Sequence, residues 1–205
     1  MYKDDAIKDD LSLNDFLVYL ESIADKFPCG IPESCLQSEQ IKVDSFIAQS
    51  DQQLVCWGDA GASIVFLMTA DTSGQEYKKS ELVGEDGSLL AAAIEKGMRL
   101  TLEQVFFIRC LAEKTAGKTR LAGWRAAIEH LPVLLSARIV VALGAPAWDI
   151  LAAAAARSGV TRGQWFKYQA CLVMPTHKLE TVLRVEAAKR EFWNDLQLVM
   201  AEINK

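Results

Sequence analysis

The chain contains four short, mostly apolar runs, and polar or turn-forming residues stand on both sides of each run. The runs cover residues 64–68, 105–108, 138–143 and 170–174. A short apolar run between turn signals is typical of a β-strand that is buried on both faces. The pattern therefore predicts four strands in the interior of one sheet.

Between and after these runs, apolar positions recur at helical spacing. Helices are predicted over residues 87–96, 121–131 and 185–203 and, earlier in the chain, over residues 12–27. Strands that alternate with helices indicate parallel pairing with helices on both faces of the sheet. We therefore expect an α/β protein, a three-layer α/β/α sandwich around a central, mostly parallel four-stranded sheet.

The start of the chain differs from the rest in charge. Residues 1–60 carry a net charge of −8 and the remainder carries +3, which gives −5 for all 205 residues. Residues 1–53 are predicted to form an acidic helical segment packed on an α/β domain at residues 54–205. The mildly basic remainder of the chain is compatible with an anionic partner. A net charge of this size is also ordinary for a solvated protein surface.

Composition narrows the class of protein. Hydrophobic residues make up 51% of the chain, which excludes disorder of the whole chain. Five cysteines without a Cys-x-x-Cys pair, and no secretory signal, indicate reduced thiols in a cytoplasmic protein. The apolar stretch 139–156 contains Gly144, Pro146 and Asp149, so we expect a strand, a turn and a helix there, and no membrane span.

The loops that follow the predicted strands are the places to look for a site. In a parallel sheet with helices on both faces, ligands bind beyond the carboxyl ends of the strands. These loops are predicted at residues 68–84, 110–120, 144–148 and 175–184.

The C-terminal third resembles the uracil-DNA glycosylase superfamily, in particular its bacterial iron–sulfur-containing branch. The matching text is RIVVALGAPAWDIL at 138–151, RGQWF at 162–166, VMPTHKLETVLR at 173–184 and KREFWNDLQ at 189–197. Fainter matches upstream are IVFLMTADT, ELVGEDGSLL and VFFIRC, so the resemblance covers residues 54–203. It implies a uracil-DNA glycosylase-like fold.

The same alignment implies that the base pocket has changed. Met68 stands where the family has a glycine in a tight turn, Leu82 where a phenylalanine stacks on uracil, and Phe106 where an asparagine reads the base. Methionine cannot replace a glycine that lets the backbone approach a ligand, and phenylalanine has no donor or acceptor for a base edge. These base-pocket positions predict an apolar, plugged cleft.

Three polar residues remain as catalytic candidates. The leaving-group histidine of the family aligns with Lys178, and His177 stands beside it, while Asp71 follows the first motif. Histidine is suited to proton donation, lysine to an anionic group and aspartate to orienting water. Each also has a structural interpretation, as a loop histidine, a solvated lysine and a turn cap.

The iron–sulfur cluster of the related branch is expected to be lost, and no cofactor is predicted. A cluster needs four thiolates. Cys110 matches one family ligand, but Trp124 occupies the next ligand position, and Cys29 and Cys35 lack the spacing of the family's pair.

Basic residues near the predicted loops suggest a groove for a phosphate backbone, with scattered surface charge as the alternative. The nucleic-acid-binding candidates are Lys114, Lys118, Arg120, Arg162 and Arg184, and Arg109 is also expected near a loop.

Three functions follow as hypotheses. The first is a glycosylase-like protein that has lost base excision and binds nucleic acid or protein. The second is an active DNA glycosylase for uracil or another damaged base, which would use Asp71, His177 and Lys178. The third is a purely structural or interaction module. DNA and protein are the partners considered, and the oligomeric state stays open.

Overall fold

The computed structural model describes residues 54–70, 82, 84–111, 118–129, 131, 134 and 137–205, with side chains in the helix 118–129 given from residue 122 onward. The predicted N-terminal segment 1–53, with its helix at 12–27, lies outside the described residues.

The described part of the chain forms one mixed sheet of six strands, in the order β1-β3-β2-β4-β6-β5. Its four central strands, β3, β2, β4 and β6, are parallel to one another, and the edge strands β1 and β5 are antiparallel to their neighbours. The strands are β1 (Leu54–Gly58), β2 (Ile64–Ala70), β3 (Val105–Leu111), β4 (Ile139–Leu143), β5 (Phe166–Tyr168) and β6 (Cys171–Thr176).

The four predicted strands are confirmed, and the predicted number of four is wrong because both edge strands were missed. β5 has only three residues, and its middle residue, Lys167, is exposed. β1 combines three buried residues with Trp57 and Gly58, which are partly exposed. β5 lacks a continuous apolar run, whereas β1 begins with four apolar residues, Leu54–Trp57, and this run was overlooked.

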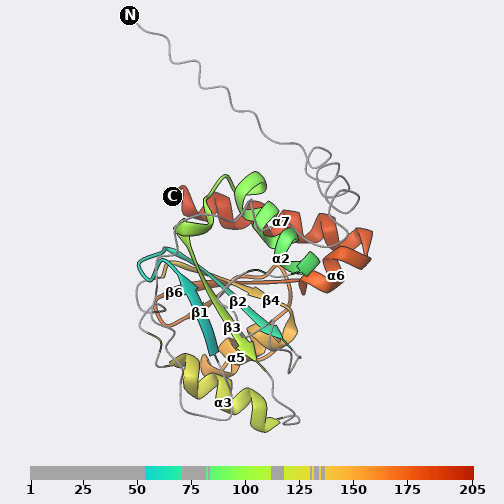
Figure 1. Ribbon diagram of the computed structural model, residues 1–205. Helices are drawn as coiled ribbons and strands as arrows, with labels where there is room; N and C mark the ends of the chain where they lie inside the picture. The colour runs from blue at the N-terminus through green and yellow to red at the C-terminus, as the bar shows by residue number, and fades with distance from the viewer. Residues whose placement is uncertain are drawn as a thin grey trace, which may run out of the picture.

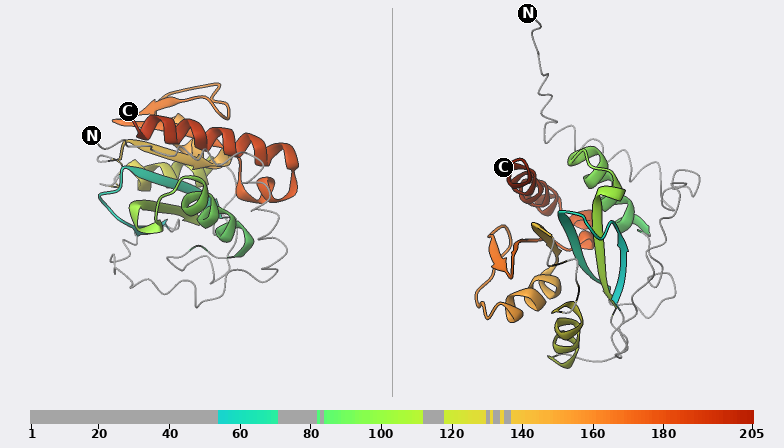
Figure 2. Two further views of the ribbon diagram at one scale, coloured as in Figure 1. Left: turned by 90° about the horizontal axis from the view of Figure 1, so that it is seen from above. Right: turned by 90° about the vertical axis from the view of Figure 1, so that its left-hand side faces the viewer.

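Helices lie on both faces of this sheet (Figure 1). The helices α2, α6 and α7 pack on one face, and α3 and α5 pack on the other, as the view along the sheet shows (Figure 2). Their bounds are α2 (Gly84–Ala92), α3 (Lys118–Glu129), α5 (Ala145–Ala154), α6 (Leu179–Arg184) and α7 (Glu186–Ile203). A π-helical turn, Ala93–Gly97, extends α2, and the 3-10 turn Leu102–Gln104 precedes β3.

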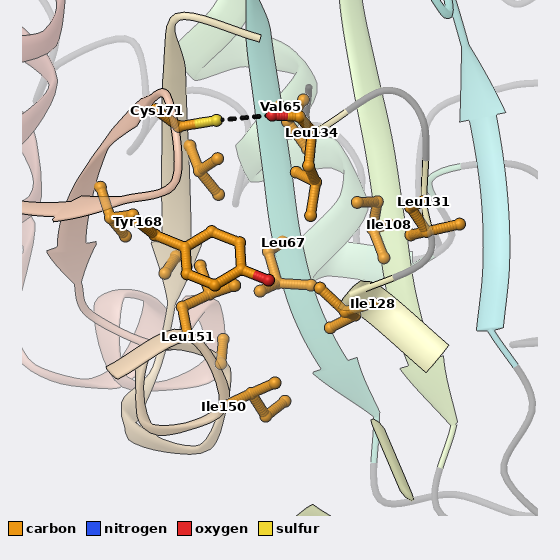
Figure 3. Packing of buried hydrophobic residues seen from close by; sticks show 14 of the residues in the cluster. Val65, Leu67, Ile108, Ile128, Leu131, Leu134, Ile150, Leu151, Tyr168 and Cys171 are labelled. Atoms are coloured by element: carbon orange, nitrogen blue, oxygen red, sulfur yellow. Dashed lines mark hydrogen bonds between the residues drawn. The ribbon is translucent and has the colours of Figure 1, made fainter. Parts of the chain in front are cut away.

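The core on the α3 and α5 face includes a polar anchor (Figure 3). The thiol of Cys171, which is fully buried, donates a hydrogen bond to the backbone oxygen of Leu134 at 2.9 Å. The Tyr168 ring lies in the same cluster, beside Leu151 and Ile128. These contacts fix the start of β6 on this face.

The apolar stretch 139–156 folds as the sequence predicted. It forms β4, a turn at Gly144 and the helix α5, which carries Pro146 in its first turn. Among the described residues, none of the helices combines the length and the apolar character needed to cross a bilayer.

Candidate functional site

The carboxyl ends of the four central strands meet at one edge of the sheet, which we call the carboxyl edge. From β2 the chain passes to β3, which lies on one side of β2. It then passes to β4 on the other side of β2, so the direction in which strands are added to the sheet reverses between β2 and β4. In such sheets the point of reversal is where ligands bind. The site therefore has to be built from what β2, β3, β4 and β6 present there.

One row of residues crosses the sheet at this edge. Met68 lies opposite Arg109 on one side and Leu143 on the other, and Leu143 lies opposite Thr176. Arg109 is 3% exposed, Met68 9%, Leu143 2% and Thr176 0%. The row is therefore closed to solvent, and its two central members are apolar.

Arg109 is the cation of this row. Its guanidinium lies 4.6 Å from the ring centroid of Trp57, which itself stacks on Phe107 with ring centroids 5.0 Å apart. A cation over an aromatic face is stabilised by the ring quadrupole, most of all where water is excluded. Arg109 was expected near a loop; it lies two residues before the end of β3, within the strand, and is buried there.

The three base-pocket positions do not line one space. Met68 and Leu82 pack in the cluster on the α2 and α7 face. Phe106 lies in the cluster on the opposite face, and its register partner is Val65, three residues before Met68. The alignment with the family thus brings Phe106 to the amino-terminal half of β3, away from the carboxyl edge, and Phe106 does not plug a cleft there.

Among the described residues, the most extensive polar network of the carboxyl edge ties the end of β6 to α7. The hydroxyl of Thr176 donates to Asp195 Oδ2 at 2.7 Å, and the next residue, His177, places its Nε2 2.6 Å from Glu191 Oε2. Glu191 and Asp195 are four residues apart and so lie on one face of α7. Two consecutive residues of one segment thus contact two consecutive turns of the helix.

Arg162 joins both carboxylates. Its Nη1 lies 2.8 Å from Asp195 Oδ1 and 2.9 Å from Oδ2, and its Nε lies 3.5 Å from Glu191 Oε2. We call these five residues the α7 clamp: Arg162, Thr176, His177, Glu191 and Asp195. Because Arg162 is committed to two carboxylates, it is poorly placed to contact a phosphate.

The two carboxylates of the clamp differ in environment. Asp195 is 2% exposed, and burial raises its pKa, although the hydrogen bonds from Thr176 and Arg162 act in the opposite direction. Glu191 is on the surface, and the hydrogen bond from His177, followed by the charge of Arg162, lowers its pKa. The clamp therefore holds one buried and one solvated carboxylate around a single guanidinium.

Two glycines shape the turns that bring these residues together. Gly163 has φ of +74°, its N–H donates to the backbone oxygen of Pro175 at 2.8 Å, and an added Cβ would lie 3.1 Å from Asp195 Oδ1. Gly144 has φ of +88°, and its N–H donates to the backbone oxygen of Thr176 at 2.9 Å. Glycine adopts this conformation at little steric cost.

Lys178 and Arg184 mark the two ends of α6. Lys178 precedes the helix and pairs with Glu180, with its Nζ 2.7 Å from Oε2. Arg184 is the last residue of the helix and is exposed. Asp86 on α2 is half-buried beside them, and burial, followed by the charge of Glu180, raises its pKa. Acids and bases are thus mixed around α6.

The other candidates cannot be placed in this geometry. Asp71 and Lys114 lie outside the described residues, as do Cys29 and Cys35. Lys118 and Arg120 belong to the first turn of α3, but their side chains are not described.

His177 and Lys178 are adjacent in the chain but have different partners. His177 contacts Glu191 on α7, and Lys178 pairs with Glu180 of α6.

Of the residues considered as cluster ligands, the two that the structure describes, Cys110 and Trp124, do not fit an iron–sulfur site. Cys110 is fully buried, and burial raises its thiol pKa well above the ordinary value, which disfavours the thiolate that a metal needs. Trp124 is also fully buried, and its Nε1 donates to the backbone oxygen of Leu111 at 3.3 Å. Within the described part of the chain, no group of three or more histidine, cysteine or acidic residues is arranged to hold a metal ion.

Sequence reasoning missed Thr176, Glu191 and Asp195. It identified the apolar face of the last helix but did not consider the acids on the remaining face. The signal that would have found them is an acid pair at helical spacing, 191 and 195, in a helix with an arginine on a preceding loop.

Comparison with known proteins does not assign the chain to a family, because no family model matches the chain and no curated protein matches it in sequence.

Proposed function

We propose that this protein is a uracil-DNA glycosylase-like protein that has lost base excision and acts by binding nucleic acid. The observation that carries the proposal is the closed carboxyl edge. In the row at this edge, which lies two residues before the ends of β2 and β3 and at the ends of β4 and β6, Met68 and Leu143 are buried apolar residues, Thr176 is bonded to Asp195, and Arg109 is buried against Trp57.

A base-excising site needs the opposite arrangement. It has to admit a flipped base, hydrogen-bond its edge and stabilise the leaving anion. The row at the carboxyl edge presents none of its four side chains to solvent, so these residues offer no surface on which a base could be read. The framework and the motif text of residues 138–197 support the glycosylase-like scaffold, and the closed row supports the loss of its chemistry.

Nucleic acid is the proposed partner because of where the basic candidates fall. Lys114, Lys118 and Arg120 follow the carboxyl end of β3, and Arg184 is exposed at the end of α6. Phosphate contacts need cations that are not already paired with acids. Arg162 is excluded from this set by its two carboxylate partners.

A fluorescence anisotropy titration with labelled single-stranded and duplex oligonucleotides, repeated at several salt concentrations, tests this proposal. We expect the logarithm of the association constant to fall linearly with the logarithm of the salt concentration. Arg184→Ala should reduce the affinity by about threefold, as expected for one lost phosphate contact near 1 kcal/mol or below. The matched control is Arg125→Ala, which removes an exposed arginine of α3 that pairs with Glu129.

Equal effects of the two substitutions would place the bound nucleic acid elsewhere. If no oligonucleotide binds even at low salt, nucleic-acid binding is refuted and protein binding becomes the function to test.

One observation favours a second function, an active DNA glycosylase. The 2.6 Å contact between His177 and Glu191 is the geometry in which a carboxylate orients an imidazole for proton transfer. A panel of oligonucleotides with different damaged bases tests this alternative. Excision that His177→Ala removes and Arg125→Ala leaves intact would support it, and a panel with no cleaved lesion would exclude it for those bases.

A further inference from the structure

Glu191 is the most exposed charged member of the α7 clamp. Its side chain is 44% exposed, whereas that of Asp195 is buried. One of its oxygens, Oε2, lies 2.6 Å from His177 Nε2 and 3.5 Å from Arg162 Nε. An exposed glutamate can leave such contacts by rotation about its side-chain bonds, with no movement of the backbone.

The two donors around Glu191 Oε2 are held by contacts that do not involve the Glu191 side chain. Arg162 Nη1 lies 2.8 Å and 2.9 Å from the two carboxylate oxygens of Asp195, and 3.4 Å from the backbone oxygen of Glu191. His177 directly follows Thr176, whose hydroxyl donates to Asp195. Arg162 and His177 therefore keep their positions when the Glu191 side chain moves away.

The place that Glu191 Oε2 occupies favours a negatively charged oxygen. The hydrogen bond from His177, followed by the charge of Arg162, lowers the pKa of Glu191. Donors that stabilise a carboxylate oxygen also stabilise a phosphate oxygen, and the guanidinium of arginine suits both. A phosphodiester carries one negative charge, as Glu191 does, so exchange of one for the other leaves the charge of the cluster unchanged.

We propose that Arg162 and His177 form a phosphate site at the carboxyl edge, and that the carboxylate of Glu191 occupies this site until a phosphate group displaces it. Arg162 is committed to carboxylates while Glu191 is in place, and its Nε becomes available to the ligand after displacement. A neutral imidazole donates through its N–H, so the site does not depend on protonation of His177.

Proton NMR of the full-length protein, titrated with inorganic phosphate at constant pH and ionic strength, tests the site. The chain has two histidines, His130 and His177, so His130→Gln assigns their ring resonances. Phosphate should shift the resonance of His177. Glu191→Ala removes the competing carboxylate and should lower the phosphate concentration at half-saturation by at least about threefold, as expected for release of an exposed ion pair.

Glu186→Ala is the matched control, because it removes the same charge from the same helix. Glu186 is 55% exposed and pairs with Lys189, away from the two donors of the site. Both variants place alanine at an exposed helical position, where it favours the helix. Glu186→Ala should leave the phosphate dependence of the His177 resonance close to that of the unmodified protein. No phosphate-dependent shift in Glu191→Ala, or an equal gain in the two variants, would overturn the proposal.

An oligonucleotide titration with the same variants identifies the source of the phosphate group, and this part rests on the proposed function. Tighter binding by Glu191→Ala than by Glu186→Ala would assign the site to a nucleic-acid backbone. A phosphate response without oligonucleotide binding would support a site for free phosphate and refute nucleic-acid binding. Oligonucleotide binding that is equal in the two variants, with no phosphate response of His177, would refute the phosphate site alone.

Discussion

At the scale of single residues, Asp195 is the group on which the carboxyl edge depends most. It is almost fully buried, and it accepts hydrogen bonds from Thr176 at 2.7 Å and from Arg162 at 2.8 Å. Removal of Asp195 leaves the buried Thr176 hydroxyl without its acceptor and Arg162 with Glu191 alone. A buried polar group that loses its partner costs more than the bond itself contributes.

Asp195→Ala should therefore lower the free energy of unfolding by about 2 kcal/mol, a value that allows for the residual solvent contact of Arg162. Urea unfolding measures this change. The control is Arg125→Ala, because Arg125 and Glu129 form an exposed pair that should contribute about 0.5 kcal/mol or less. Similar losses in the two variants would contradict the role assigned to Asp195.

Gly163 offers a second test at this scale. Its φ of +74° disfavours any residue with a Cβ, and the added carbon would also crowd Asp195 Oδ1 at 3.1 Å. Gly163→Ala should cost about 2 kcal/mol, which combines left-handed backbone strain with displacement of the carboxylate.

Gly159→Ala separates the two causes. Gly159 has φ of +70°, but a Cβ there would meet nothing within 4 Å. This variant should lose only the backbone part, about 1 kcal/mol. Equal losses for Gly159→Ala and Gly163→Ala in urea unfolding would show that contact with Asp195 has no influence on stability.

Sequence reasoning reached some of these residues and not others, for a physical reason. Gly144 and Pro146 act locally, through backbone conformation, and their roles as turn and helix start were predicted and are confirmed. Arg162 and Asp195 are separated by 33 residues, and they meet only because β6 and α7 lie side by side. The spacing of Glu191 and Asp195 places them on one helix face, but no local pattern shows that Arg162 contacts them.

At the scale of elements, the start of α2 depends on close contact with the chain before it. Gly87 is inside the helix, where alanine is ordinarily better than glycine by about 1 kcal/mol. A Cβ at Gly87, however, would lie 2.6 Å from the backbone carbonyl carbon of Leu82. Backbone atoms cannot yield as a flexible side chain can.

Gly87→Ala should therefore lower the free energy of unfolding by about 1–3 kcal/mol. Helix propensity alone predicts the opposite, an increase in stability. A thermal melt followed by circular dichroism measures the shift. A higher melting temperature in the variant would mean that α2 and residue 82 are not in contact.

The predicted elements were most accurate where burial is continuous. The four central strands and the helix at the end of the chain have apolar patterns long enough to identify, and α7 begins within one residue of the predicted start. The boundary of β3 was less certain, because Arg109 interrupts the apolar run. Burial of Arg109 against Trp57 is a tertiary effect, so the sequence pattern ended the strand too early.

At the scale of the whole molecule, alternation of strands and helices predicted an α/β protein with a parallel centre, which the structure confirms in this general form. The pairing of β1 beside β3 and of β5 beside β6 was not predicted. β5 has only three residues and little apolar signal, whereas the apolar run Leu54–Trp57 of β1 was overlooked. The base pocket was predicted from an alignment whose register places Phe106 on the wrong half of its strand. Of the three predicted base-pocket positions, Met68 lies in the row near the carboxyl edge, where it is buried beside Leu143, a residue that the prediction did not include.

We propose that a glycosylase-like framework here carries a closed carboxyl edge that cannot excise a base. The most direct test is a single-turnover assay with purified, nuclease-free protein in excess over single-stranded and duplex oligonucleotides that contain one uracil. We predict no abasic product above the protein-free control, for the unmodified chain and for His177→Ala alike. Uracil release by the unmodified chain, abolished in His177→Ala, would contradict the account.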